Sequence, residues 1–253
     1  MAKRLAYGGA QLAFVGIFVV LWQWAATSGK IDTFFLGEPR GMWRLLREWS
    51  GDGSLVSNLW VTTHLVLLGF LVGLAIGAVL GCLLHFSRFF HDVFGPYLTF
   101  FNACPRVILY PFLVVWLGFG MMPKVVTIVL VMVPTVAINI AAGFKDIDND
   151  YVANIRALGA TRFAVAKNVY APSLGLWLLA TSRVTFGFAF QAGVVAEVLG
   201  SKSGLGFLIL EGQTRFKVDV MFASMVILVL LALVVDFVLS LVERRATRWM
   251  PSR

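Results

Sequence analysis

Residues 125–144 read VVTIVLVMVPTVAINIAAGF, a run of twenty residues without a charged side chain. A helix rises about 1.5 Å per residue, so about 20 apolar residues cross the hydrocarbon core of a bilayer. A charged side chain near the bilayer centre costs about 2.5–3.5 kcal/mol, which is why spanning helices avoid charge. This stretch therefore predicts a transmembrane helix.

Five further intervals are similarly poor in charge. Intervals 5–29 and 53–87 contain no Lys, Arg, Asp or Glu. Three others contain one charged residue each: Arg106 in 93–123, Arg183 in 168–196 and Asp236 in 220–242. Only 13% of the chain is charged and 59% is hydrophobic, whereas soluble domains carry about 25% charged residues. We expect an all-α integral membrane protein with about six transmembrane helices, and this composition excludes a soluble enzyme.

The predicted helices divide the chain into three parts. Residues 1–54 hold the first transmembrane helix and an amphipathic helix after Pro39, which is expected to lie on the outer membrane surface. Residues 55–248 form the main transmembrane domain, and residues 249–253 form a cytoplasmic tail. The first helix could instead be a secretory signal, but Ala25-Ala26-Thr27 is a poor cleavage site, so a retained anchor is expected.

The charge distribution predicts the orientation and excludes some partners. With the amino terminus inside, the inner segments carry eleven Lys and Arg residues and the outer segments eight. The positive-inside rule then places both termini in the cytoplasm. The net charge of +8 is spread between apolar runs, which indicates contact with anionic lipid rather than nucleic acid. Cys82 and Cys104 lack a metal-binding spacing, so no metal site is expected.

Glycines recur at every fourth position of the second predicted span, at Gly69, Gly73, Gly77 and Gly81. This spacing places all four on one helical face. Small residues let helices approach closely in a membrane, where apolar burial gives no preference for protein over lipid. We expect this face to pack against another helix rather than to line a pore.

The longest inner loop, residues 145–171, is patterned like two short helices. Asp148 is expected to cap the start of the first helix, and Gly159 its end. Thr161 is expected to cap the second helix, which runs to Tyr170 before Pro172 opens the fifth span. The first helix has an apolar stripe with no local core to bury it: Tyr151, Val152, Ile155 and Leu158. A docking partner would cover this stripe, and a hairpin lying on lipid headgroups is the alternative.

The same loop resembles a motif of the permease subunits of binding-protein-dependent ATP-binding-cassette importers. That motif has a Glu-Ala-Ala, a Gly four residues after the last Ala, and then a hydrophobic residue and a Pro. Gly159, Val169 and Pro172 stand at the matching spacings. The Glu-Ala-Ala positions read Ala153-Asn154-Ile155, and Ala171 replaces the usual Leu before the Pro. The acidic start of the motif is therefore absent.

The similarity covers about residues 55–248 and points to the nitrate, sulfonate and taurine branch of these importers. It rests on six stretches in the same order: Asn102-Ala103-Cys104-Pro105-Arg106, Tyr110-Pro111, Trp116-Leu117-Gly118-Phe119-Gly120, Lys124, Val195-Ala196-Glu197 and Ser203-Gly204-Leu205-Gly206. The resemblance implies import of nitrate, a sulfonate, taurine or a related organic anion. A vitamin or pyrimidine precursor is the alternative solute.

The resemblance also implies partners. Two permease chains, expected to be a homodimer, would form the pathway in a bacterial inner membrane. An external solute-binding protein would deliver the solute, and a dimer of cytoplasmic ATPase subunits would bind ATP and Mg. The loop at 145–171 would be a coupling loop that docks on the ATPase through Ala153, Asn154, Ile155, Arg156, Ala157, Leu158, Gly159, Ala160 and Arg162. The chain itself has no Gly-x-x-x-x-Gly-Lys-Ser/Thr, so no cofactor and no catalytic residue are expected on it.

Polar side chains inside the predicted spans are candidates for the solute pathway, because exposing them to lipid would be costly. They are Asn102, Arg106, Arg183, Gln191 and Glu197. Alternatively, the two arginines could reach the cytoplasmic headgroups and Glu197 could lie at the outer interface. Asn102 and Arg106 share a helical face beside Pro105, which is expected to bend the helix. Asp236 and His64 look isolated, and for them interhelical hydrogen bonds are favoured over proton transfer.

Two other functional classes are open to this composition. A secondary transporter with Glu197, Asp236 or His64 as a proton relay would work without an ATPase and would usually show an internal repeat, which is not evident. An intramembrane enzyme would need a nucleophile and a base or a metal cluster, and neither HExxH nor GxSxG occurs.

Overall fold

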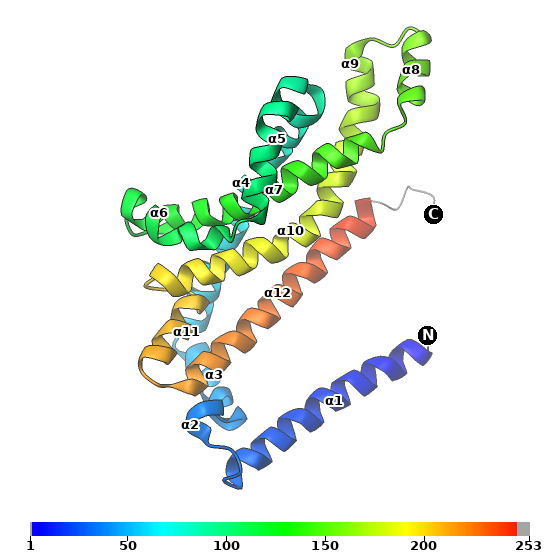
Figure 1. The fold of residues 1–253 in the computed structure, drawn as a ribbon. Helices are drawn as coiled ribbons and strands as arrows, with labels where there is room; N and C mark the ends of the chain where they lie inside the picture. Colours follow the sequence, from blue (N-terminus) through cyan, green and yellow to red (C-terminus); the bar gives the residue numbers. More distant parts are fainter. Residues whose placement is uncertain (1, 247–253) are drawn as a thin grey trace. The chain divides into compact units, whose positions relative to one another are not determined.

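The structure is a computed structural model that describes residues 2–246, apart from the side chains of residues 2–8, 11, 12, 149 and 246. The predicted tail at 249–253 lies outside the described residues. Within them all regular elements are helical (Figure 1), and the all-α prediction is confirmed. The elements are α1 (Ala2–Thr27), α2 (Thr33–Leu36), α3 (Pro39–Gly51), α4 (Ser54–Phe86), α5 (Arg88–Ala103), η1 (Arg106–Leu109), α6 (Tyr110–Leu117), α7 (Met121–Lys145), α8 (Asn149–Ala157), α9 (Arg162–Val165), η2 (Ala166–Tyr170), α10 (Ala171–Gly200), α11 (Leu205–Thr214) and α12 (Val218–Ala246).

Each predicted span coincides with a helical stretch or with a bent pair of helices, and the described residues give up to five candidate spans where about six were expected. Four stretches are long and apolar enough to cross a membrane: Ser54–Phe86, Met121–Lys145, Arg162–Gly200 and Val218–Arg245. A fifth consists of two helices, Arg88–Ala103 and Arg106–Leu117, bent by 91°. The described part of α1 contributes a shorter apolar helix, Ala13–Thr27.

The bend between α5 and η1 lies where the sequence predicts it. Pro105 has no backbone N–H and pushes the preceding residue out of the helical region. Cys104 accordingly adopts φ −78° and ψ 144°, an extended conformation. The interval 93–123 is therefore not a straight helix but two helical arms joined by non-helical backbone.

The chain divides into two compact units, which are described separately. The first unit is Met1–Val61 with Lys202–Val229, and the second unit is Thr62–Ser201 with Leu230–Arg253. The main core of the second unit comes from α4, α7 and α10, with the buried side chains of Val66, Ile128, Met132, Phe186 and Ala189 at its centre.

The glycine stripe of α4 faces α7 within the second unit. Ideal Cβ atoms at Gly69, Gly73, Gly77 and Gly81 would lie 2.7, 3.1, 2.6 and 2.7 Å from the nearest side-chain atoms of Ile128, Met132, Val136 and Ile140, respectively. Both sets of residues repeat every four positions, so a ridge of large side chains on α7 fits the groove that the glycines leave on α4. This contact is what brings α4 and α7 close together.

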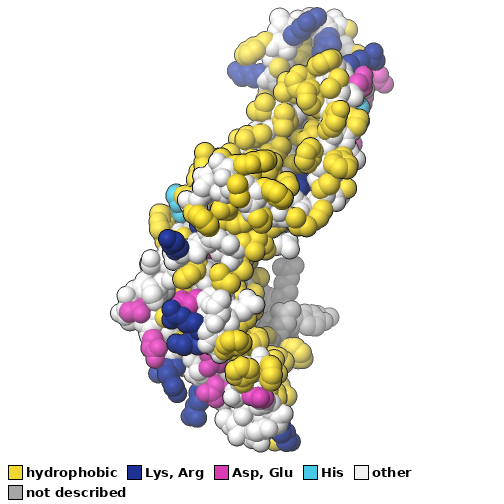
Figure 2. All heavy atoms as spheres, turned by 60° about the vertical axis from the view of Figure 1, so that its left-hand side comes forward, with side chains coloured by type: hydrophobic (Ala, Val, Ile, Leu, Met, Phe, Trp, Pro, Cys, Tyr) yellow, Lys and Arg dark blue, Asp and Glu magenta, His cyan; other side chains and the backbone are white. Residues whose placement is uncertain are grey.

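In the first unit, the two segments that were predicted to lie outside are joined to each other. The backbone N–H of Glu38 donates to Oδ1 of Asp219 over 2.9 Å, and the rings of Phe34 and Phe216 stack at 6.1 Å. An ideal Cβ at Gly41 would overlap Oδ2 of the same Asp219, so glycine leaves room for this carboxylate at the start of α3. Acidic and basic side chains of this unit alternate over the lower part of Figure 2.

The loop at 145–171 forms the predicted hairpin with the predicted caps. Asp148 accepts a hydrogen bond from the N–H of Asp150 over 2.8 Å, and Thr161 accepts one from the N–H of Ala164 over 3.2 Å. Gly159 adopts φ +92°, the left-handed region that favours glycine at a helix end. These three local signals are confirmed.

One expectation about this hairpin was wrong, and the structure adds one feature that was not predicted. The apolar stripe of α8 does have a local core, because Val152 is buried against Val165 and Val169. The second helix ends at Tyr170 and Pro172 stands at the start of α10, as predicted, but the helices follow one another without a break as one stretch, Arg162–Gly200, of 39 residues. The π-helical turn η2 precedes the proline, and its wider spacing accommodates the missing N–H. The hairpin therefore continues directly into α10.

Candidate functional site: the hairpin and the polar groups inside the spans

The α8–α9 hairpin lies at the end of α7 and α10 (Figure 1), and it exposes large apolar side chains. Leu158 is 88% exposed, Phe163 77% and Tyr151 57%. Figure 2 shows Lys and Arg side chains around the same tip, at the top of the view. A charged hairpin tip is suited to an aqueous environment, where exposed apolar side chains of this size mark an interaction surface.

The residues predicted to dock an ATPase divide into two groups. Ile155 and Ala160 are partly buried against the hairpin core. The others are exposed: Ala153, Asn154, Arg156, Ala157, Leu158, Gly159 and Arg162. Asp148, which stands near the missing Glu of the family motif, uses a carboxylate oxygen to cap α8. Sequence reasoning did not single out Phe163, although it follows Arg162 directly on the exposed face.

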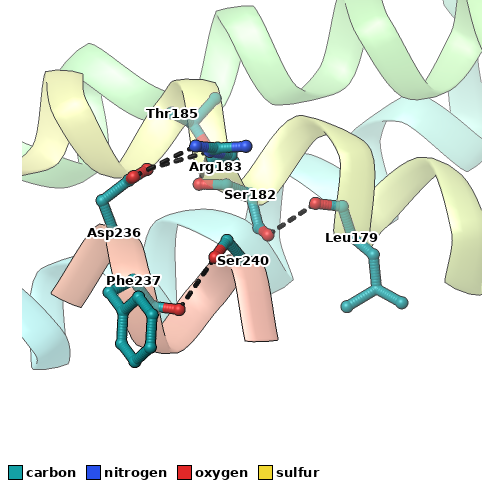
Figure 3. Close-up of polar contacts among 7 residues, drawn as sticks. All are labelled: Leu179, Ser182, Arg183, Thr185, Asp236, Phe237 and Ser240. Atoms are coloured by element: carbon teal, nitrogen blue, oxygen red, sulfur yellow. Dashed lines mark hydrogen bonds and ion pairs between the residues drawn. The ribbon is translucent and has the colours of Figure 1, made fainter. Parts of the chain in front are cut away.

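Arg183 and Asp236 form an ion pair inside the spans (Figure 3). Nε of Arg183 lies 2.9 Å from Oδ1 of Asp236, and Nη2 lies 3.1 Å from Oδ2, so the contact is bidentate. The interhelical hydrogen bond predicted for Asp236 is confirmed, and its partner, which the sequence did not identify, lies 53 residues away on another helix. The pair joins α10 to α12 and neutralises both charges. The nearby hydroxyls of Ser182 and Ser240 donate to carbonyls of their own helices.

Glu197 lies in a buried polar cluster rather than at a solvated interface. It is 0% exposed, and Thr62 donates to its Oε2 over 2.9 Å. Lys124 is only 8% exposed; it donates to Ser201 over 3.0 Å and attracts Glu197 electrostatically. The structure does not bring Arg183 into this cluster, and Gln191, between them along α10, is exposed. The sequence marked Lys124 only through the family resemblance, and nothing in it pointed to Thr62.

Arg106 turns toward α7 instead of reaching for headgroups. Its Nη1 donates to the carbonyl of Val131 over 2.8 Å, and its Nη2 donates to the carbonyl of Asn102 over 3.3 Å. The side chain of Asn102 accepts a hydrogen bond from Thr135 over 2.9 Å. The two polar residues that flank Pro105 are therefore both tied to α7, close to its own proline at Pro134.

No group of three or more His, Cys, Asp or Glu side chains suited to a metal ion occurs among the described residues. The polar groups of the spans instead form an ion pair, a buried cluster and an arginine bound to backbone carbonyls. These are binding and positioning contacts, and none of them pairs a nucleophile with a base.

Comparison with known proteins gives a consistent result. Residues 69–248 match the family model described as a binding-protein-dependent transport system inner membrane component. The chain is 26% identical over 250 residues to SsuC of Bacillus subtilis (strain 168), described as an aliphatic sulfonates transport permease protein, covering 98% of this chain and 91% of that protein. It is 24% identical over 240 residues to TauC of Escherichia coli (strain K12), described as a taurine transport system permease protein, covering 93% and 87%.

A solved structure supports the fold. A chain from an inward-facing form of the MetNI methionine ABC transporter aligns with a TM-score of 0.69 at 21% sequence identity, covering 78% of this chain and 98% of that one. The matched family model spans well over half of the sequence. The chain thus belongs to the family of inner membrane components of binding-protein-dependent transport systems, and it is a multi-pass permease subunit of an ABC importer.

Proposed function

We propose that this permease imports a small organic anion, most naturally a sulfonate or taurine, with energy supplied by ATPase subunits that dock on the α8–α9 hairpin. Two copies of the chain, an ATPase dimer that binds ATP and Mg, and an external solute-binding protein would complete the importer. The observation that carries the proposal is the continuity of the hairpin with α10 through the 39-residue stretch Arg162–Gly200.

The surface chemistry of the hairpin favours a protein partner over lipid headgroups. A hairpin lying on headgroups would turn its apolar side chains to one side, toward the bilayer. Here the inward side chain Val152 fills a local core, while Leu158 and Phe163 remain exposed among cationic residues. A groove on a partner would bury these two side chains, and each burial would contribute about 1.5–3 kcal/mol to the free energy of binding.

The geometry also supplies a route for the energy of ATP hydrolysis. The chain has no phosphate-binding loop of its own, so nucleotide must act through contact. A force on the hairpin reaches α10 without an intervening flexible joint, because η2 continues the helix. From α10 it reaches α12 through the Arg183–Asp236 ion pair. Nucleotide state in the partner would thereby bias these helices between two arrangements.

The proposed topology has both termini in the cytoplasm. Two contacts support it, because they require the segments before α4 and after α10 to lie on the same side of the membrane. Glu38 bonds to Asp219, and the N–H of Gly204 donates to the side chain of Asn58 over 2.7 Å. Both segments then lie outside, and the hairpin lies on the cytoplasmic side where an ATPase can reach it.

Two different observations support the proposal that the solute is an anion. Relatives that align over most of this chain are described as sulfonate and taurine permeases. The second unit also places the Arg106 guanidinium inside the spans on backbone carbonyls, which leaves its positive charge available to an anion.

The test is co-purification of the tagged chain from its native membrane, comparing wild type with Leu158→Asp and Phe163→Asp. Both side chains are exposed, so these changes leave the hairpin core intact. The matched control is Phe119→Asp, an exposed aromatic on the loop between α6 and α7 that is proposed to lie outside. We expect a stoichiometric ATPase subunit with wild type and control, and its loss or uncoupling with both hairpin variants.

Two results would count against the proposal. Full ATPase binding and solute uptake by both hairpin variants would remove the docking role of α8 and α9. Solute uptake by a wild-type preparation that contains no ATPase subunit would favour an ion-coupled secondary transporter instead.

A further inference from the structure

A polar stripe runs along the exposed face of α10 in the second unit. Arg183, Gly187 and Gln191 are exposed and stand four positions apart, which places them on one side of the helix. An ideal Cβ at Gly187 has no atom within 4 Å, so the face is open between the two polar side chains. The neighbouring Val184 and Phe188 are also exposed. The stripe is therefore the polar part of a face that the second unit leaves uncovered.

The stripe lies within the depth of the hydrocarbon core. Arg183 lies about 18 Å and Gln191 about 30 Å from the first residue of α10, a helix about 45 Å long. Asp236, the partner of Arg183, likewise lies about 27 Å along α12, a helix about 44 Å long. Because the hydrocarbon core is about 30 Å thick, all three residues project from backbone at membrane depth.

Lipid is an unfavourable neighbour for this face. The side chains of Arg183 and Asp236 are 49% and 46% exposed, so the second unit does not enclose the pair. Ionisable side chains inside a membrane are costly in lipid, and they face a bundle interior or a water-filled cavity. The exposed half of this pair is thus expected to border water.

Asp236 holds the guanidinium of Arg183 in one orientation. Nε and Nη2 donate to the two carboxylate oxygens, and Figure 3 shows the other end of the planar group turned away from Asp236. A guanidinium carries five N–H donors. These two hydrogen bonds are the ones that Arg183 forms among the described residues, so three donors remain, two of them on Nη1.

We propose that Arg183 is the anion-binding group of a water-filled pathway along α10, where its Nη1 donates to the sulfonate of the passing solute. Gly187 leaves room beside it, and Gln191 lines the same pathway. Asp236 weakens the attraction of Arg183 for the anion, which suits a pathway, because a solute must bind well enough to enter and weakly enough to leave. This inference rests on the proposed function and names the residues that the solute meets.

A cysteine in the stripe tests whether this face borders water. Gly187→Cys is made in a background without the two native cysteines, Cys82→Ala/Cys104→Ala, and the complex with its ATPase is placed in lipid nanodiscs. The probes are the anion sulfonatoethyl methanethiosulfonate and the cation trimethylammonioethyl methanethiosulfonate. With either probe the thiolate attacks sulfur, a disulfide forms and methanesulfinate leaves, which the intact mass of the permease chain reports.

The matched control is Gly16→Cys in the same background. Gly16 is also an exposed helical glycine with no atom within 4 Å of its ideal Cβ, but it lies in α1 between the exposed Phe14 and Ile17. Both probes should modify Gly187→Cys at least about tenfold faster than Gly16→Cys, because the thiolate is the reactive form and lipid disfavours it. Gln191→Cys repeats the measurement one turn further along the stripe.

The two probes also report the charge of Arg183, which lies about 6 Å from position 187 along the helix axis. Each rate is divided by the rate of that probe with a free thiol. Asp236→Asn leaves Arg183 with its full charge, so the ratio of the anionic to the cationic rate should rise by about tenfold, the combined effect of a unit charge about 6 Å away in bulk water. Arg183→Gln leaves only the carboxylate, so the ratio should fall below its value with the pair intact.

Competition tests the sulfonate contact itself. Ethanesulfonate should slow the anionic labelling of Gly187→Cys, more strongly in Asp236→Asn and not in Arg183→Gln, whereas the neutral dimethyl sulfone should have no effect. A structural role of the ion pair would produce none of these charge-dependent changes.

The outcomes separate this inference from the proposed function. Gly187→Cys and Gln191→Cys that are as unreactive as Gly16→Cys would overturn the water-filled pathway. A rate ratio that stays the same in Asp236→Asn and Arg183→Gln, or equal competition by ethanesulfonate in both, would overturn the role of Arg183. ATP-driven sulfonate uptake by wild type would leave the importer in place in each case. Failure of wild type to import ethanesulfonate, taurine or nitrate would refute the proposed solute class, and the sulfonate contact with it.

Discussion

A single methyl group added at Gly77 should separate α4 from α7. The ideal Cβ of Gly77→Ala would lie 2.6 Å from Cβ of Val136 and 3.2 Å from the backbone oxygen of Val133. Carbon atoms in favourable contact are about 3.5–4.0 Å apart, so the helices would have to move by about 1 Å. Val136 is fully buried and branched at the atom in question, so rotation of its side chain cannot relieve the contact.

The expected cost is about 1–3 kcal/mol, the usual range for overpacking a well-packed core. Gly187→Ala is the matched control, because Gly187 also lies inside a helix of the second unit but has no atom within 4 Å of its ideal Cβ. Alanine favours a helix over glycine by up to about 1 kcal/mol at both sites, so the difference between the variants isolates the steric cost. Gly73→Ala should fall between them, since its nearest atoms, Cβ and Sδ of Met132, lie 3.1 Å away and not 2.6 Å as at Gly77.

The assay is reversible unfolding of the purified chain in mixed micelles with increasing denaturing detergent, followed by circular dichroism. The expected order of stability is Gly187→Ala, then Gly73→Ala, then Gly77→Ala. A Gly77→Ala protein as stable as Gly187→Ala would refute the close contact between α4 and α7.

Three other substitutions test the polar contacts. Asp236→Ala should destabilise the protein because it leaves Arg183 without its carboxylate. The Arg183→Ala/Asp236→Ala double variant should then be more stable than Asp236→Ala in the same unfolding assay, and the reverse order would mean that the pair contributes nothing. Lys124→Met removes the cation beside the buried Glu197 and should destabilise the protein. Glu197→Gln should restore part of the lost stability in the double variant, and no recovery would contradict their coupling. Asp219→Ala removes the acceptor of the Glu38 N–H and should lower the stability of the protein by about 1 kcal/mol, as for other helix-capping side chains. Amide hydrogen exchange at the start of α3 should become faster, and unchanged exchange there would contradict the contact.

Features governed by neighbouring residues could be predicted from the sequence. The capping roles of Asp148 and Thr161 and the conformation of Gly159 depend on backbone groups within three residues, so residue type alone indicated them. The six apolar intervals followed from the cost of charge in lipid, which acts residue by residue. The bend at Pro105 followed from the missing N–H of a single residue.

Features that depend on a second helix could not be predicted in this way. Arg183 and Asp236 each looked unpartnered because the ion pair joins helices 53 residues apart in the chain. The burial of Val152 depends on Val165 and Val169 across the hairpin turn. The continuity of α9 with α10 required a π-helical turn before Pro172, and no residue pattern signals such a turn.

The most direct test of the central claim is uptake of a labelled sulfonate by proteoliposomes that contain the complete importer, with and without internal ATP, for wild type and Leu158→Asp. The account predicts uptake that requires ATP in wild type and falls to background in Leu158→Asp, while Phe119→Asp behaves like wild type. Equal uptake without ATP, or undiminished ATP-driven uptake by Leu158→Asp, would contradict energy transfer through the hairpin.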